Sequence, residues 1–231
     1  MADLARNDPA AIGQLRKELA VTNAVLSENG LPEHQEPSSC DTWSADGYGY
    51  SGLHGLRAVA GLVWQGKDVP RDRVLDGPGE GLDQALFAEI LAHIYPARPS
   101  LLQRLLRRGA TQEQPTPPFA HLVAHSDAQG IYVPISFELP LVPAQMDDAF
   151  GYLWPLGSVP ALQAELTQLA KLLDVPDDLL STDDAMAELL EQGGRPDGGL
   201  WQAQPIATYS LLILREACAH SMKTGAAICF G

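Results

Sequence analysis

The chain has 231 residues, of which 45% are hydrophobic and 19% are charged, and its formal net charge at pH 7 is −14. The hydrophobic fraction excludes a disordered chain, and the length is enough for one sizeable hydrophobic core. A chain with this much negative charge repels nucleic acid phosphates and anionic lipid. We therefore expect a soluble protein that binds neither nucleic acid nor membrane. Basic proteins or cations are the partners that this charge favours.

Export and membrane insertion are not expected. Residues 1–10 carry charges where a secretion signal needs an apolar stretch, and the nearly apolar run Ile206–Leu214 is too short to cross a bilayer. The three cysteines, Cys40, Cys218 and Cys229, are odd in number and form no paired motif, which argues against a disulfide framework. We therefore expect a cytoplasmic protein with reduced thiols.

Apolar periodicity and helix-ending residues predict four helices in the first half of the chain. The first begins at Pro9, which suits an initial helical position, and ends before Asn29-Gly30. Ser51 is a plausible N-cap for the second helix, which ends at Gly66. Two more helices are expected over residues 82–95 and 99–109.

The second half predicts further helices and a little strand structure. A two-turn helix is expected to end near His125, followed by strand chemistry over residues 131–137, and the closing residues 226–230 are a candidate second strand that pairs with it. Longer helices are expected over residues 156–174, 182–193 (capped by Thr182) and 205–225, the last one enclosed because its first half is apolar on nearly every side.

About eight helices and two or three short strands indicate a predominantly α-helical α+β fold. We expect a single α-rich globular domain over residues 1–231, with a candidate hinge near residues 110–118, where a proline-rich link lies.

Negative charge is concentrated between Glu138 and Asp197. This segment has 12 acidic residues against Lys171 and Arg195, a local net charge of −10. Such a segment is either a solvated face that maintains solubility or a docking surface for a basic partner.

Three arginines oppose this trend. Arg104, Arg107 and Arg108 have the spacing that places guanidinium groups on one helical face, where they could bind a phosphate or a carboxylate. The alternative is that they pair with an acidic patch of the same or a neighbouring subunit.

His121, His125 and Asp127 are the candidate metal ligands. Two histidines four residues apart lie on one face of a helix, and a nearby carboxylate could complete a two-histidine, one-carboxylate set for a divalent metal such as zinc. However, Leu122 stands where the zinc-protease motif requires glutamate. The structural alternative places His125 at a helix C-terminus and Asp127 in a turn before the strand.

A glycine and tyrosine loop precedes the second helix. Tyr48, Tyr50, His54 and Arg57 are candidates for a pocket there, together with Asp46, and a packed surface with a satisfied histidine is the alternative. The glycines match neither a phosphate-binding loop nor a nucleophile elbow.

No catalytic pattern is complete, and no cofactor is expected apart from that metal. This favours a non-enzymatic, acidic interaction domain that binds a basic protein by charge complementarity, as immunity or inhibitor proteins do. The alternative is a metal-dependent hydrolase that uses His121, His125 and Asp127 to activate a bound water.

Overall fold

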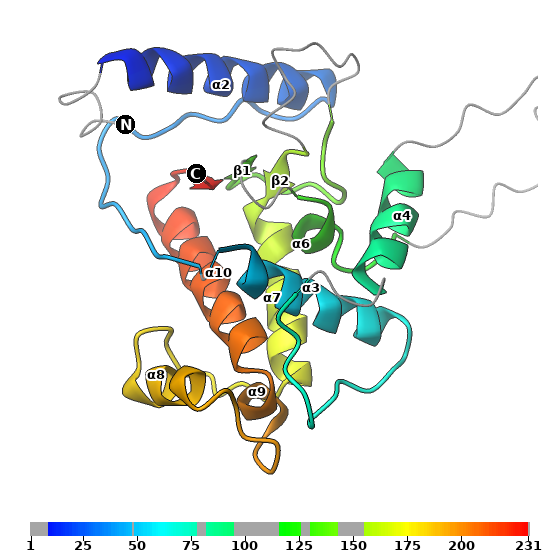
Figure 1. Cartoon of the computed structure of the whole chain (residues 1–231). Helices are drawn as coiled ribbons and strands as arrows, with labels where there is room; N and C mark the ends of the chain where they lie inside the picture. Colours follow the sequence, from blue (N-terminus) through cyan, green and yellow to red (C-terminus); the bar gives the residue numbers. More distant parts are fainter. Residues whose placement is uncertain are drawn as a thin grey trace, which may run out of the picture.

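The computed structural model describes residues 9–47, 49–77, 82–94, 116–125, 130–142 and 155–230. These residues form eight helices and one three-stranded sheet, which confirms the predicted, mostly helical α+β class (Figure 1). The helices are α2 (Pro9–Glu28), α3 (Gly49–Trp64), α4 (Leu82–Ile94), α6 (Ala120–Ala124), α7 (Val159–Leu172), α8 (Asp184–Glu191), α9 (Leu200–Ala203) and α10 (Pro205–Thr224). The strands are β1 (Gly130–Val133), β2 (Gly157–Ser158) and β3 (Ile228–Phe230).

Helix α10 lies at the centre and packs against both α3 and α7 (Figure 1). Its side chains Leu211, Leu212 and Cys218 have no exposed surface, which confirms that the helix is enclosed. Pro205 begins the helix, and Gly225 ends it in the left-handed conformation with φ 77°. The main hydrophobic core is therefore built around this one helix.

Two glycines of α3 allow the close packing that this core requires. A Cβ atom on Gly52 would lie 2.3 Å from the Ser210 hydroxyl oxygen of α10. A Cβ atom on Gly55 would lie 2.3 Å from the carbonyl oxygen of Leu75. A larger residue at Gly55 would therefore displace the backbone at Leu75. One at Gly52 would displace the Ser210 hydroxyl and crowd the Gly47 carbonyl oxygen at 2.8 Å.

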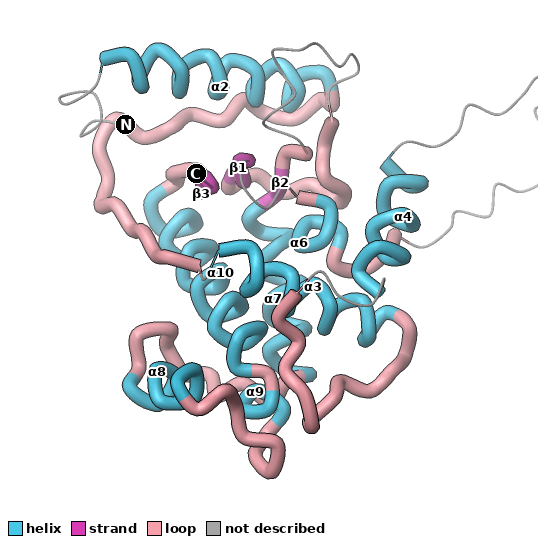
Figure 2. Tube along the Cα trace, viewed as in Figure 1, coloured by secondary structure: helices cyan, strands magenta, loops and turns pink. Residues whose placement is uncertain are grey.

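The sheet has the order β2-β1-β3 (Figure 2). Strand β1 pairs in parallel with β2, where Tyr132 is opposite Gly157, and antiparallel with β3, where Tyr132 is opposite Ile228. The prediction that the closing residues form a strand paired with the first is confirmed. Pro134, which lacks a backbone N–H, follows the last residue of β1.

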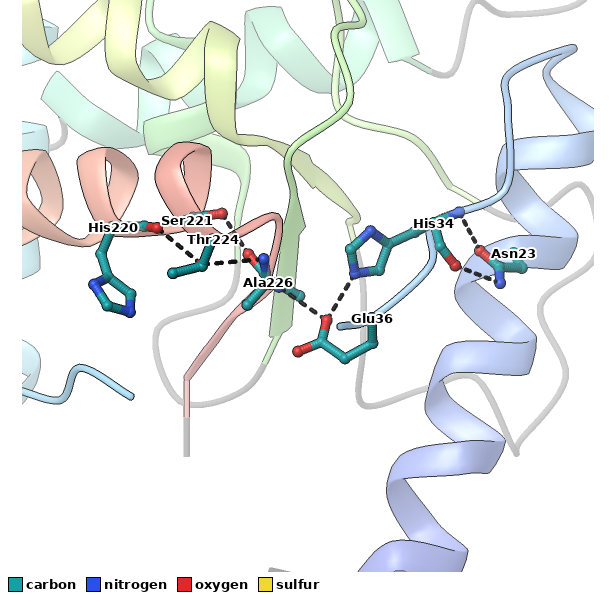
Figure 3. A network of polar contacts seen from close by, with 8 residues as sticks. Asn23, His34, Glu36, His220, Ser221, Thr224 and Ala226 are labelled. Carbon is teal, nitrogen blue, oxygen red and sulfur yellow. Dashed lines mark hydrogen bonds and ion pairs between the residues drawn. The ribbon is translucent and has the colours of Figure 1, made fainter. Parts of the chain in front are cut away.

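Helix α2 lies beyond the sheet, at the end of the molecule opposite α8 (Figure 1). A polar network ties it to the C-terminal turn (Figure 3). The Asn23 side chain donates to the His34 carbonyl at 3.0 Å and accepts the His34 N–H at 2.7 Å. One carboxylate oxygen of Glu36 then lies 2.8 Å from His34 Nε2 and accepts the Ala227 N–H at 3.0 Å.

Some details differ from the sequence-based expectations. Asp183, and not Thr182, is the N-cap residue of α8. Helix α9 and strand β2 were not predicted. The helix expected at residues 99–109 and most of the candidate hinge at residues 110–118 lie outside the described residues, so the single-domain expectation stays a prediction. None of the described helices is both long enough and apolar enough to span a membrane.

Candidate functional site

Both ring nitrogens of His121 contact backbone groups of the fold. Its Nδ1 accepts the backbone N–H of Ser158 at 3.0 Å, and its Nε2 lies 3.3 Å from the carbonyl oxygen of Glu138. A neutral imidazole protonated on Nε2 satisfies both contacts. Burial lowers the pKa of His121 to about 4, so this neutral form prevails at neutral pH. Both ring nitrogens of His121 thus have hydrogen-bond partners within the fold.

His125 is the C-cap residue of α6. Its ring stacks on that of Tyr132 with a centroid separation of 3.9 Å, and its Nε2 lies 3.3 Å from the Ile131 carbonyl oxygen. These contacts agree with the helix-end interpretation. Asp127 lies outside the described residues, and within the described ranges no group of three His, Cys, Asp or Glu side chains could hold a metal ion.

Arg57 belongs to the interior and supports α6 from α3. Its Nε donates to the Leu122 carbonyl at 2.9 Å and its Nη2 donates to the His125 carbonyl at 2.5 Å, so the cation satisfies carbonyls at the helix C-terminus. The rest of the predicted pocket is sparsely described: His54 is half-buried, while Tyr48 and the side chain of Tyr50 lie outside the described part. Arg104, Arg107 and Arg108 also lie outside it.

Glu165 lies in the acidic segment from Glu138 to Asp197, but its side chain is bound inside the fold. Its carboxylate accepts the backbone N–H groups of His121 at 3.0 Å and Leu122 at 2.8 Å, so it supports the start of α6. Burial raises the pKa of Glu165 to about 8, although these N–H groups act in the opposite direction. Glu165 is therefore not part of an acidic surface, because its side chain is bound by the backbone N–H groups of α6.

The acidic surface that the structure does describe is residues 172–197, which we call the acidic end. It comprises the last residue of α7, the following turns, α8 and the start of the loop to α9 (Figure 1). Its acidic residues are Asp174, Asp177, Asp178, Asp183, Asp184, Glu188, Glu191 and Asp197. With Arg195 as its only cation, it has a net charge of −7, which is half of the charge of the whole chain.

Three carboxylates form a row along α8. Asp184, Glu188 and Glu191 follow the spacing that places side chains on one helical face, and all three are exposed. Met186 and Leu189 are buried and anchor the opposite face of the helix. An α-helix rises about 1.5 Å per residue, so successive carboxylates of the row are spaced by about 6 Å and about 4.5 Å along its axis.

Little within the described structure neutralises the acidic end. Arg195 Nη2 lies 4.0 Å from a carboxylate oxygen of Glu188, and Asp183 accepts the backbone N–H of Leu180 at 2.8 Å. The other six carboxylates make no ion pair with any residue that the structure describes. Their negative potential is therefore available to a partner.

The turn before α8 is fastened to α10 by two residues that the sequence reasoning missed. Arg215 Nη2 donates to the Leu179 carbonyl at 2.6 Å, and the two carboxylate oxygens of Glu216 accept the N–H and hydroxyl of Ser181 at 2.7 and 2.9 Å. The signal in the sequence was an adjacent pair of opposite charges directly after the nearly apolar run Ile206–Leu214. These contacts hold the turn at residues 179–181, which leads into α8, against the central helix.

The model of a family described as "Putative DNA-mimic protein" matches residues 1–230. The chain belongs to this family. No curated protein and no solved structure matches the chain. The family description concerns mimicry of DNA, which is itself a polyanion, as the acidic end is.

The DNA-mimic family overturns the functions expected from the sequence. The metal-dependent hydrolase is wrong, because the family description is of a mimic and not of an enzyme. The immunity or inhibitor-like domain is corrected to a member of the DNA-mimic family, which keeps the acidic character that motivated the earlier hypothesis. The error arose because a charge count identifies an excess of carboxylates and not what the carboxylates resemble.

Proposed function

We propose that this protein binds a DNA-binding protein by presenting its acidic end in place of DNA phosphates. The observation that carries the proposal is the row of Asp184, Glu188 and Glu191, exposed along one face of α8 in a member of a DNA-mimic family. The partner is a protein with a basic surface, and the site that is blocked on it is its DNA-binding site.

The charge spacing supports this proposal. Each strand of DNA carries one charge per about 3.4 Å of helix axis, and the row on α8 offers one per about 5 Å. Arginine and lysine side chains are long enough to accommodate this difference, and the guanidinium fork binds a carboxylate by the same paired hydrogen bonds as a phosphate.

The rigidity of the acidic end also supports it. Because Arg215 and Glu216 hold the preceding turn on α10, little conformational entropy is lost when a partner binds. The net charge of −14 has a further consequence, since it repels DNA itself and directs the protein to proteins that bind DNA.

The test is displacement of DNA. A fluorescent duplex is bound to a purified histone-like protein or to a helix-turn-helix repressor, and this protein is added while fluorescence anisotropy is measured. The parent is expected to release the duplex from at least one of them without binding the duplex itself.

A charge-matched comparison identifies the surface. Asp184→Asn/Glu188→Gln/Glu191→Gln is expected to displace poorly, whereas Glu33→Gln/Asp41→Asn/Asp46→Asn, which removes three exposed carboxylates elsewhere, is expected to displace as the parent does. The proposal would be refuted if the parent released the duplex from neither protein. It would also be refuted if the two variants released the duplex equally well.

A further inference from the structure

Two leucines of the acidic end are exposed. Leu172 is 41% exposed and Leu180 is 47% exposed. Five large hydrophobic side chains of the described residues are exposed, and these two are the pair that falls within one short charged segment. A single exposed leucine needs no explanation, but two in the same segment as eight carboxylates add apolar area to what the segment can offer a partner.

The fold holds both leucines outward. Leu169 and the C-cap residue Leu173 are fully buried, whereas Leu172, the last residue of α7, lies at the edge of this buried stripe and is exposed. Leu179 is buried, and its carbonyl accepts from Arg215, while the N–H of Leu180 donates to Asp183 at 2.8 Å. Leu180 therefore projects from a fixed turn and not from a frayed end.

Phosphates offer a partner only charge and hydrogen bonding, whereas base edges also offer apolar contact, such as the thymine methyl group. Proteins that read bases accordingly carry apolar side chains beside their arginines and lysines. A purely basic tail has no such side chains and gains nothing from a leucine.

We propose that Leu172 and Leu180 form one mixed apolar and acidic surface with the surrounding carboxylates, and that it fits a folded DNA-binding protein with apolar side chains beside its basic ones. The inference rests on the proposed function and specifies the kind of partner. Charge complementarity positions that partner, and apolar contact with the two leucines distinguishes it from other basic proteins.

Two synthetic helical peptides test this surface. They have equal length and equal arginine content, and one carries leucines beside the arginines where the other carries glutamines. The parent is expected to bind the leucine peptide about tenfold more tightly, since burying an apolar side chain contributes on that scale. Titration calorimetry of the full chain measures both affinities.

Leu172→Asn/Leu180→Asn is expected to bind both peptides as the parent binds the glutamine peptide. The matched control, Trp43→Asn/Met222→Asn, removes two exposed hydrophobic side chains outside the acidic end and is expected to keep the preference. Circular dichroism confirms that each variant is folded, so a lost preference is not a lost fold.

Equal binding of the two peptides by the parent, or a preference that survives in the leucine variant, would overturn this inference alone. The proposed function fails separately. It fails if the parent binds neither peptide, or if Asp184→Asn/Glu188→Gln/Glu191→Gln binds both as tightly as the parent does.

Discussion

The guanidinium of Arg215 donates to the backbone carbonyl of Leu179 at 2.6 Å. The cation that anchors the acidic end thus bonds to the backbone and makes no ion pair with a carboxylate that the structure describes. Glu216, the next residue, contributes in the same way by accepting from Ser181. An arginine and a glutamate of the central helix therefore hold the acidic end in place without neutralising it.

Glu216→Ala tests this anchoring. The substitution leaves the N–H and hydroxyl of Ser181 without their carboxylate acceptor, so we expect the free energy of unfolding to fall by about 1–3 kcal/mol. Urea unfolding measures the loss. Glu188→Ala, which removes an exposed carboxylate of α8, is the control and should change the unfolding free energy by less than about 0.5 kcal/mol. Equal losses in both variants would contradict the anchoring role.

The row on α8 should affect binding far more than stability. In Asp184→Asn/Glu188→Gln/Glu191→Gln, loss of the favourable Asp184 at the helix N-terminus costs about 0.3–1 kcal/mol, and loss of the unfavourable Glu191 at the C-terminus offsets it. We therefore expect an almost unchanged unfolding midpoint together with weaker displacement of DNA from its protein. A large loss of stability would instead assign the row a structural role.

The buried, neutral His121 predicts acid sensitivity. The unfolded chain takes up a proton on this histidine below about pH 6.5, whereas the folded chain does so only near pH 4, so stability falls as the pH decreases through this window. The contribution is up to about 3 kcal/mol. Unfolding of His121→Asn, whose side-chain oxygen can accept from Ser158, should show a weaker pH dependence. Parallel pH profiles of parent and variant would contradict this expectation.

Glu165 predicts the opposite trend toward higher pH. Its raised pKa of about 8 means that the folded chain retains a proton that the unfolded chain releases above about pH 4.5, so stability falls as the pH rises between these values. Glu165→Gln cannot titrate and should lose this component of the decline. The test is the difference in unfolding free energy between the parent and Glu165→Gln, measured from about pH 4.5 to about pH 8. A difference that stays constant over this range would show that Glu165 is ionised in the folded protein.

Local signals in the sequence were enough for most of the helices. Pro9, Pro205 and Gly225 mark helix ends by their own backbone chemistry, so these boundaries could be predicted without the fold. The apolar run from Ile206 likewise predicted an enclosed helix. Helix α9 has only four residues, which is too few for an apolar period to be visible.

The candidate sites depended on contacts that no local pattern contains. The spacing of His121 and His125 predicted both on one helix, but α6 ends before His125. The surroundings of the two rings depend on Ser158 and Tyr132, which come from other segments. Glu165 was counted as surface charge for the same reason, since its partners lie more than 40 residues away. The acidic end lies within the acidic segment Glu138–Asp197 that the sequence indicated, because its charges are close together along the chain.

Retention of partners from nuclease-treated cell extract on the immobilised chain tests the central claim most directly, with duplex DNA added as competitor. We predict that the retained proteins bind DNA when purified, that the duplex releases them, and that Asp184→Asn/Glu188→Gln/Glu191→Gln does not retain them. Retained proteins that the duplex cannot release, or that the variant holds as firmly as the parent, would contradict DNA mimicry by the acidic end.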